Sequence, residues 1–215
     1  MQSLFYIKQY HYLAGLVALC AASVLSYAYL GNLFVFDFDK EYSLPSLYHY
    51  ALLFVCCYGF FRLMQLERAY DVWFFAFAYL LIDDMTTLHE TAGWLLAKYV
   101  IPSGYWFFTK RAIGEIVYLA VVGSLLGVLM VKRFWRASAQ VRKQFGILTI
   151  LIIAFGLFGV LVDSIHEKAC STRDTLCFAL GVIEDGGEIF VTILIIHRIR
   201  KLLPRQITSH VPQKT

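Results

Sequence analysis

Long apolar runs are the feature that most limits the folds open to this chain. The first run, 12–30, contains no charged residue. A helix of about 20 apolar residues crosses the hydrocarbon core of a bilayer, and lipid leaves no other way to satisfy the backbone of an isolated span. Hydrophobic residues fill 60% of the 215 positions, and the mean hydropathy is +0.65. These values are typical of a polytopic membrane protein and exclude an ordinary soluble domain.

The apolar runs predict one all-α domain over residues 1–215, a polytopic membrane bundle of six transmembrane helices. The predicted spans are 12–30, 47–61, 72–97, 113–131, 145–162 and 176–196. The first and fifth runs are uninterrupted, whereas the third, fourth and sixth contain acidic residues. The connections between spans are short and leave no room for a soluble domain.

Basic residues in the short loops predict the orientation. Thirteen Lys and Arg residues fall on one side of the predicted membrane and six on the other. The side richer in Lys and Arg is normally cytoplasmic, so both termini should be cytoplasmic and segments 31–46, 98–112 and 168–175 external. We expect a bacterial inner membrane, with lipids as partners. The basic clusters suit anionic lipid, and nothing indicates nucleic-acid binding.

Acidic side chains inside the predicted spans are the main functional signal. Nine carboxylates and two histidines lie there: Asp83, Asp84, Glu90, Glu115, Asp163, Glu167, Glu184, Asp185, Glu188, His89 and His166. Each acid at the bilayer centre costs about 2.5–3.5 kcal/mol on the insertion scale. Because the sequence places no Lys or Arg at the same depth, we expect protons, metal cations or a cationic substrate to neutralise them.

The helical rise of about 1.5 Å per residue sorts these side chains by depth. A deep group near mid-membrane comprises Asp83, Asp84, Glu184, Asp185 and Glu188. A mouth group near the external ends comprises His89, Glu90, Glu115, Asp163, His166 and Glu167. The sequence therefore predicts that four helices converge their acids on one pocket in the outer half of the membrane.

The side-chain types indicate a divalent metal site. The predicted ligands are Asp83, Asp84, His89, Glu115, Asp163, His166, Glu184, Asp185 and Glu188, with Glu90 and Glu167 as proton carriers. Imidazole beside carboxylate suits Zn, Mn or Fe, whereas oxygen ligands alone suit Ca, Mg or Mn. Asp163 and His166 have the i, i+3 spacing of dimetal carboxylate bundles, but the third span has Thr86 where a second histidine would stand. The alternative is that the acids are protonated or hydrogen-bonded between helices.

Two further motifs predict structure. Cys170 and Cys177 flank a loop assigned to the external side, where an oxidising compartment would join them in a disulfide. Gly123 and Gly127 have the spacing that lets transmembrane helices approach closely, so we expect them at a helix–helix contact.

The acidic pattern resembles that of a group of known proteins. Asp83-Asp84 with His89-Glu90, then Asp163 with His166-Glu167, then Glu184-Asp185-x-x-Glu188 is similar to small multi-pass bacterial membrane proteins of unassigned function. The resemblance covers the third to sixth spans, and it implies no activity.

Three functions are consistent with an intramembrane acidic pocket. The first is a metal-dependent membrane hydrolase or oxidoreductase that acts on a lipid-like substrate. The second is a transporter or channel for cations or protons. The third is a sensor or assembly subunit whose acids receive a partner's basic segment. The sequence leaves the oligomeric state open.

Overall fold

A computed structural model describes residues 9–31, 33–38, 40, 42–104, 108–170 and 174–209. The predicted all-α class is confirmed, because the elements in these ranges are helical. They are α1 (Gln9–Leu30), a 3-10 turn (Phe34–Phe36), α2 (Leu44–Leu66), a 3-10 turn (Arg68–Tyr70), α3 (Asp71–Thr86), α4 (Leu88–Tyr99), α5 (Lys110–Arg136), α6 (Ala139–Gly156), a π-helical segment (Leu157–Val162), α7 (Asp163–Cys170) and α8 (Asp174–Ser209). Parts of the predicted external loops, residues 105–107 and 171–173, lie outside the described residues.

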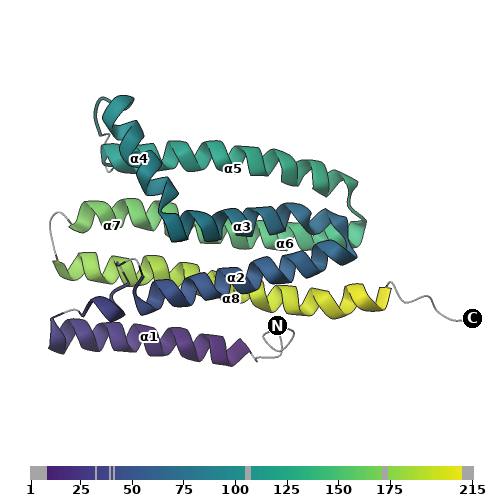
Figure 1. Ribbon diagram of the computed structural model, residues 1–215, viewed down its shortest axis with the longest axis horizontal. Helices are drawn as coiled ribbons and strands as arrows, with labels where there is room; N and C mark the ends of the chain where they lie inside the picture. Colours follow the sequence, from purple (N-terminus) through teal and green to yellow (C-terminus); the bar gives the residue numbers. More distant parts are fainter. Residues whose placement is uncertain are drawn as a thin grey trace, which may run out of the picture.

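Four helices in the described part of the chain are long and apolar enough to cross a membrane. They are Gln9–Leu30, Leu44–Leu66, Lys110–Arg136 and Ala139–Cys170, the last including α6, the π-helical segment and α7. They contain the first, second, fourth and fifth predicted spans, and each extends beyond the predicted limits. The sixth predicted span lies within α8, which runs beside these helices in Figure 1. A count of six spans stays a prediction.

The third predicted span, 72–97, is wrong as a single helix. Thr87 adopts the left-handed conformation, with a φ of 49°, and ends α3. Asp83 then accepts a hydrogen bond from the backbone N–H of His89 and so satisfies the start of α4. As Figure 1 shows, α4 leaves the direction of α3 and crosses toward the start of α5. This turn carries His89 and Glu90 onto a separate helix.

Helix starts follow ordinary capping chemistry. The hydroxyls of Ser43, Thr109 and Ser138 precede α2, α5 and α6, and each accepts a hydrogen bond from the backbone N–H three residues later. Such a bond satisfies one of the amide groups that a helix leaves unpaired at its N-terminus. The cap at Thr109 fixes where α5 begins, and therefore where Glu115 lies.

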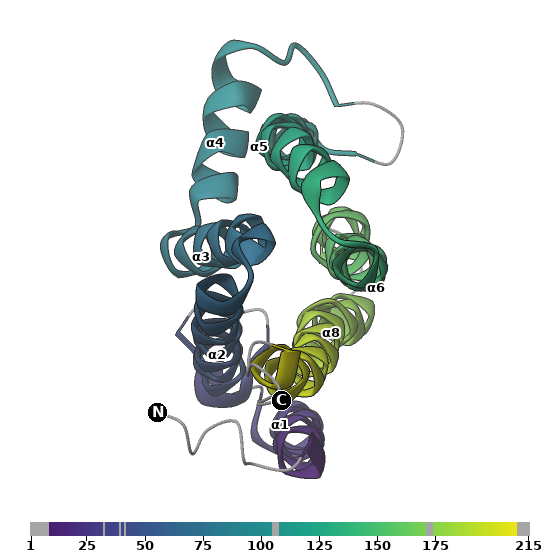
Figure 2. The same cartoon turned by 90° about the vertical axis from the view of Figure 1, so that its right-hand side faces the viewer.

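The helices form two rows, which Figure 2 shows end-on. One row contains α2, α3 and α4, and the other contains α5, α6 and α8, with α1 beside α8. Direct packing joins the rows where α2 meets α8 and where α4 meets α5. Between them, an aromatic cluster that includes Phe60, Trp73, Phe77 and Phe145 fills the core, with ring centroids 5.1 Å apart for Phe60–Phe77 and 5.5 Å apart for Trp73–Phe145.

Candidate functional site

A cavity of about 660 Å³ lies between the helices of the two rows. All eleven acidic and histidine residues predicted from the sequence line it: Asp83, Asp84, His89, Glu90, Glu115, Asp163, His166, Glu167, Glu184, Asp185 and Glu188. The side chains therefore converge on one cavity as predicted, although their individual roles stay predictions. They arrive from α3, α4, α5, α7 and α8, and within the cavity they separate into smaller groups.

One group, which we call the inner triad, consists of His49 on α2, Asp84 on α3 and Glu188 on α8. Nδ1 of His49 lies 3.3 Å from Asp84 Oδ2 and 3.8 Å from Glu188 Oε2. The side chains are 6%, 19% and 12% exposed. One ligand atom from each residue falls within 4.8 Å of the others, which is close enough to share a metal ion.

Thr192 contacts the other nitrogen of the His49 ring, Nε2. The Thr192 hydroxyl donates its proton to the backbone carbonyl of Glu188 at 2.8 Å, and its oxygen lies 3.4 Å from His49 Nε2. With its only proton committed, the hydroxyl can act only as an acceptor toward the imidazole. This favours the tautomer with hydrogen on Nε2, and it leaves the lone pair of Nδ1 facing Asp84 and Glu188.

A glycine makes room for the carboxylate of Glu188. A Cβ added at Gly159 would lie 1.9 Å from Glu188 Oε1. Gly159 belongs to the π-helical segment Leu157–Val162, a type of distortion that often occurs at functional sites. The position of the Glu188 carboxylate thus depends on the absence of a side chain at Gly159.

The second group, which we call the outer triad, consists of Asp163 and His166 on α7 and Glu184 on α8. Nδ1 of His166 lies 2.7 Å from Glu184 Oε2, and one ligand atom from each of the three residues falls within 4.8 Å of the others. His166 is buried, and Glu184 is 15% exposed. Like the inner triad, the outer triad combines one imidazole with two carboxylates.

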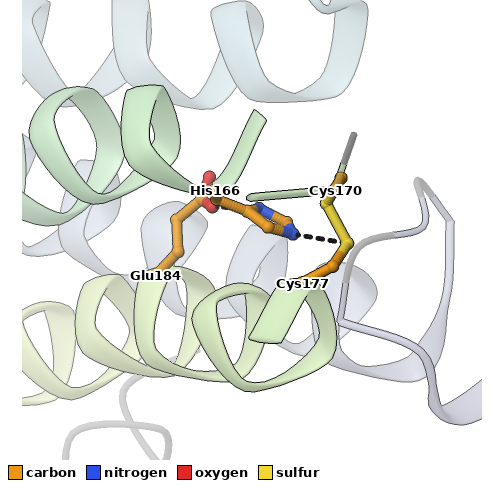
Figure 3. Close-up of a disulfide and its surroundings, with 4 residues drawn as sticks. All are labelled: His166, Cys170, Cys177 and Glu184. Atoms are coloured by element: carbon orange, nitrogen blue, oxygen red, sulfur yellow. Dashed lines mark hydrogen bonds and ion pairs between the residues drawn. A yellow bond between two sulfur atoms is a disulfide. The ribbon is translucent and has the colours of Figure 1, made fainter. Parts of the chain in front are cut away.

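The predicted disulfide between Cys170 and Cys177 is confirmed, and it lies beside the outer triad (Figure 3). Cys177 Sγ is 3.5 Å from His166 Nε2, on the side of the ring away from Glu184. A disulfide sulfur has no proton to donate, so toward Nε2 it can only accept, and the Glu184 carboxylate 2.7 Å from Nδ1 is also an acceptor. While they are joined, the two sulfurs are not available as thiolate ligands.

The two triads are neighbours. Glu184 and Glu188 are one turn apart on the same face of α8, a separation of roughly 6 Å along the helix. Glu184, predicted in the deep group, pairs with His166, predicted in the mouth group, so the two groups are in contact.

Asp83 and His89 pair with each other beside the triads. Asp83 accepts hydrogen bonds from the Tyr79 hydroxyl and the His89 backbone, both at 3.1 Å, and its Oδ2 lies 2.8 Å from His89 Nδ1. Burial lowers the pKa of His89, but the hydrogen bond to Asp83, with the negative charges of Asp83, Glu115 and Asp84, raises it more, to about 9. His89 lies on α4, outside the four apolar helices, and joins that helix to α3.

Arg111 at the start of α5 overturns the expectation that no basic side chain reaches the acids. Its Nε lies 2.8 Å from Glu115 Oε1, and its Nη2 donates to Glu90. The sequence prediction counted Arg111 as a loop residue, whereas the Thr109 cap places it in the first turn of α5. Two of the predicted functional acids, Glu90 and Glu115, thus share one guanidinium.

A tight helix crossing positions this ion-pair cluster. A Cβ at Gly93 on α4 would lie 2.3 Å from Glu115 Cγ, and one at Gly114 on α5 would lie 2.4 Å from the Gly93 carbonyl oxygen. Glycine at both positions is what lets α4 and α5 approach. Nearby, Glu167 accepts a hydrogen bond of 2.6 Å from the Thr109 hydroxyl.

Sequence reasoning missed His49. The residue lies inside the second predicted span, and a buried histidine in an apolar run is itself a signal of function. It supplies the imidazole that the third span lacks at Thr86. Because α2 and α3 pack side by side, the second histidine can come from a neighbouring helix rather than from the same helix turn.

Over the residues that the structure describes, the fold and this cavity define an all-α protein with four candidate membrane helices and candidate His/carboxylate metal-binding groups. The chain belongs to the family described as Domain of unknown function (DUF8692), and the match covers residues 35–198. No curated protein and no solved structure matches the chain. The matched residues include both triads, and the family description assigns no activity.

Proposed function

We propose that this protein is an integral membrane protein with a dinuclear divalent-metal centre, in which the inner and outer triads each hold one cation. The single observation that carries the proposal is the repeated grouping of one imidazole with two carboxylates, close enough to share a cation, in two adjacent groups. Two cations would neutralise much of the negative charge that otherwise makes this cavity costly inside a membrane.

The ligand set supports a transition metal. Together the triads offer two imidazoles and four carboxylates, the same composition as the dimetal centres of carboxylate-bridged helical bundles. Mixed nitrogen and oxygen ligands suit Zn, Mn or Fe better than Ca or Mg. Each imidazole also has an outer acceptor at Nε2, the Thr192 hydroxyl for His49 and the Cys177 sulfur for His166. Metal-binding histidines commonly have such a partner, which fixes the ring and its tautomer.

We further propose that the centre serves a hydrolase or oxidoreductase acting on a lipid-like substrate. A bound divalent cation supplies Lewis acidity and activates water or oxygen at neutral pH. Glu90 and Glu167 line the same cavity outside both triads, where each could take up or release a proton. The Arg111 and Thr109 contacts hold these carboxylates at the rim of the cavity.

The membrane placement follows the same reasoning. The excess of Lys and Arg on one side supports cytoplasmic termini, an inner bacterial membrane and a cavity that opens to the exterior. A disulfide beside the outer triad supports an oxidising compartment at that end.

Elemental analysis of the detergent-purified protein tests the proposal. We expect about two equivalents of Zn, Mn or Fe per chain, and His49→Gln and Asp163→Asn should each lower the metal content. His11→Gln, on an exposed position of α1, is the matched control and should retain the metal. Purified protein that holds no stoichiometric metal, even after incubation with Mn²⁺ or Zn²⁺, would refute the proposal. Equal metal content in all variants would refute the assignment to the triads.

A further inference from the structure

The cavity continues beyond the carboxylates as an apolar arm. Leu119, Val122, Leu126 and Met130 line this arm from α5, and Ile152 and Phe155 line it from α6. The α5 residues recur at intervals of three and four positions after Glu115, so they form one face of the helix that begins at the acidic end. None of these side chains has a role in metal binding.

The arm is long. From Glu115 to Met130 the rise along α5 is about 22 Å, more than the roughly 15 Å of one leaflet's hydrocarbon. An extended hydrocarbon chain could therefore lie along α5 with one end at the triads. The apolar walls offer such a chain contacts comparable to those in lipid.

Gly123 and Gly127 widen the arm. Both line the cavity, and a Cβ added at either position would meet no atom within 4 Å. The sequence-based expectation that they mediate a close helix–helix contact is wrong within the described chain, because their open side faces the cavity. Gly123 is also exposed, as expected if the arm opens along α5. A membrane lipid could enter from the side.

We propose that the apolar arm binds the hydrocarbon chain of a single-chain amphiphile, and that its oxygen-bearing head group lies at the triads. The position of the head group rests on the proposed metal centre, because the triad carboxylates without bound metal ions would repel a carboxylate or phosphate head. The position of the chain rests only on the apolar arm. A hydrocarbon chain gains little hydrophobic energy on moving from lipid into such an arm, so the head group decides which amphiphiles are retained.

The cavity has a size that accommodates a single-chain ligand. A cavity of about 660 Å³ is shared between the acidic end and the arm. It is within the range of about 300–1,000 Å³ that accommodates drug-sized ligands. An arm beside one helix face suits a fatty acid, a long-chain alcohol or a prenyl phosphate. The common chemistry is a long chain with one oxygen-rich end.

Photo-cross-linking in phosphatidylcholine vesicles tests the proposal. The probe is hexadecanoic acid with a diazirine near its tail end, and the labelled residues are mapped by mass spectrometry. We expect labelling around Met130, and labelling nearer Leu119 with a corresponding octanoic acid probe. Gly127→Leu should reduce labelling of the arm about tenfold by filling it. Gly146→Leu is the matched control, because a Cβ there also meets nothing within 4 Å but the residue does not line the cavity.

The metal content of the same samples separates the two proposals. Reduced labelling in Gly127→Leu with unchanged metal content supports the chain-binding arm. The chain-binding proposal is overturned, even if metal is present, by either of two results. One is labelling that Gly127→Leu does not change, and the other is labelling that spreads equally over lipid-facing residues such as Val128. Specific labelling of the arm in a protein that binds no metal would keep the chain site and refute the metal centre.

Discussion

Replacing Gly159 with alanine should weaken metal binding at the inner triad while leaving the fold intact. The new Cβ would lie 1.9 Å from Glu188 Oε1, and ordinary van der Waals contact begins at 3.4 Å. The carboxylate must therefore move by about 1.5 Å. The displaced atom is the far end of a flexible side chain, so the backbone can stay in place.

The magnitude follows from the tolerance of metal sites. Metal–ligand distances are fixed within about 0.2 Å, so a displacement of about 1.5 Å removes Glu188 as a ligand. We expect the affinity for Mn²⁺ or Zn²⁺ to fall by at least the roughly 10–100-fold that the loss of an outer hydrogen-bond partner causes. Alanine also has a helix preference over glycine of about 0.5–1 kcal/mol, so the protein should not become less stable.

The assay is a metal titration of detergent-purified protein, with thermal unfolding measured in parallel. Gly156→Ala is the matched control, since this residue lies one turn earlier and a Cβ there meets nothing within 4 Å. Unchanged affinity in Gly159→Ala would show that Glu188 is not a ligand. Equal losses in both variants would point to a general disturbance of the segment, and the reasoning would then fail.

Three further predictions concern other parts of the site. Reducing the Cys170–Cys177 disulfide should lower the unfolding free energy by about 2–3 kcal/mol, as expected for a short loop with a sequence separation of 7. It should also weaken metal binding at His166. Unfolding experiments and metal titrations, each with and without a phosphine reductant, test the two effects. Arg111→Gln should destabilise the protein by about 1–3 kcal/mol because two carboxylates lose a shared partner, and Lys110→Gln is the control in chemical unfolding. Thr87→Gly should raise the unfolding free energy by about 1 kcal/mol, because glycine adopts a φ of 49° without strain; a lower melting temperature would contradict this.

The fold class could be predicted because membrane spans are a local property of the sequence. Runs of apolar residues such as 12–30 and 145–162 must form helices in lipid wherever they pack, since their backbone groups have no other partners. The disulfide was predictable for a similar reason, since its two cysteines flank one short loop. The break at Thr87 was not predictable from the sequence, because no local sequence pattern marks a left-handed threonine. The break is stabilised by the hydrogen bond from the His89 backbone, at the start of the next helix, to Asp83.

The sequence alone determined that this chain gathers acids and histidines at one end of a helical bundle. Depth follows from the rise per residue, and burying many carboxylates in lipid requires them to face one another. Only the tertiary structure decided which side chains form each group. His49 joins Asp84 because α2 packs on α3, and Arg111 reaches Glu90 because two glycines let α4 cross α5 closely. These pairings depend on the rotation of each helix about its axis, which packing between helices sets and no single helix encodes.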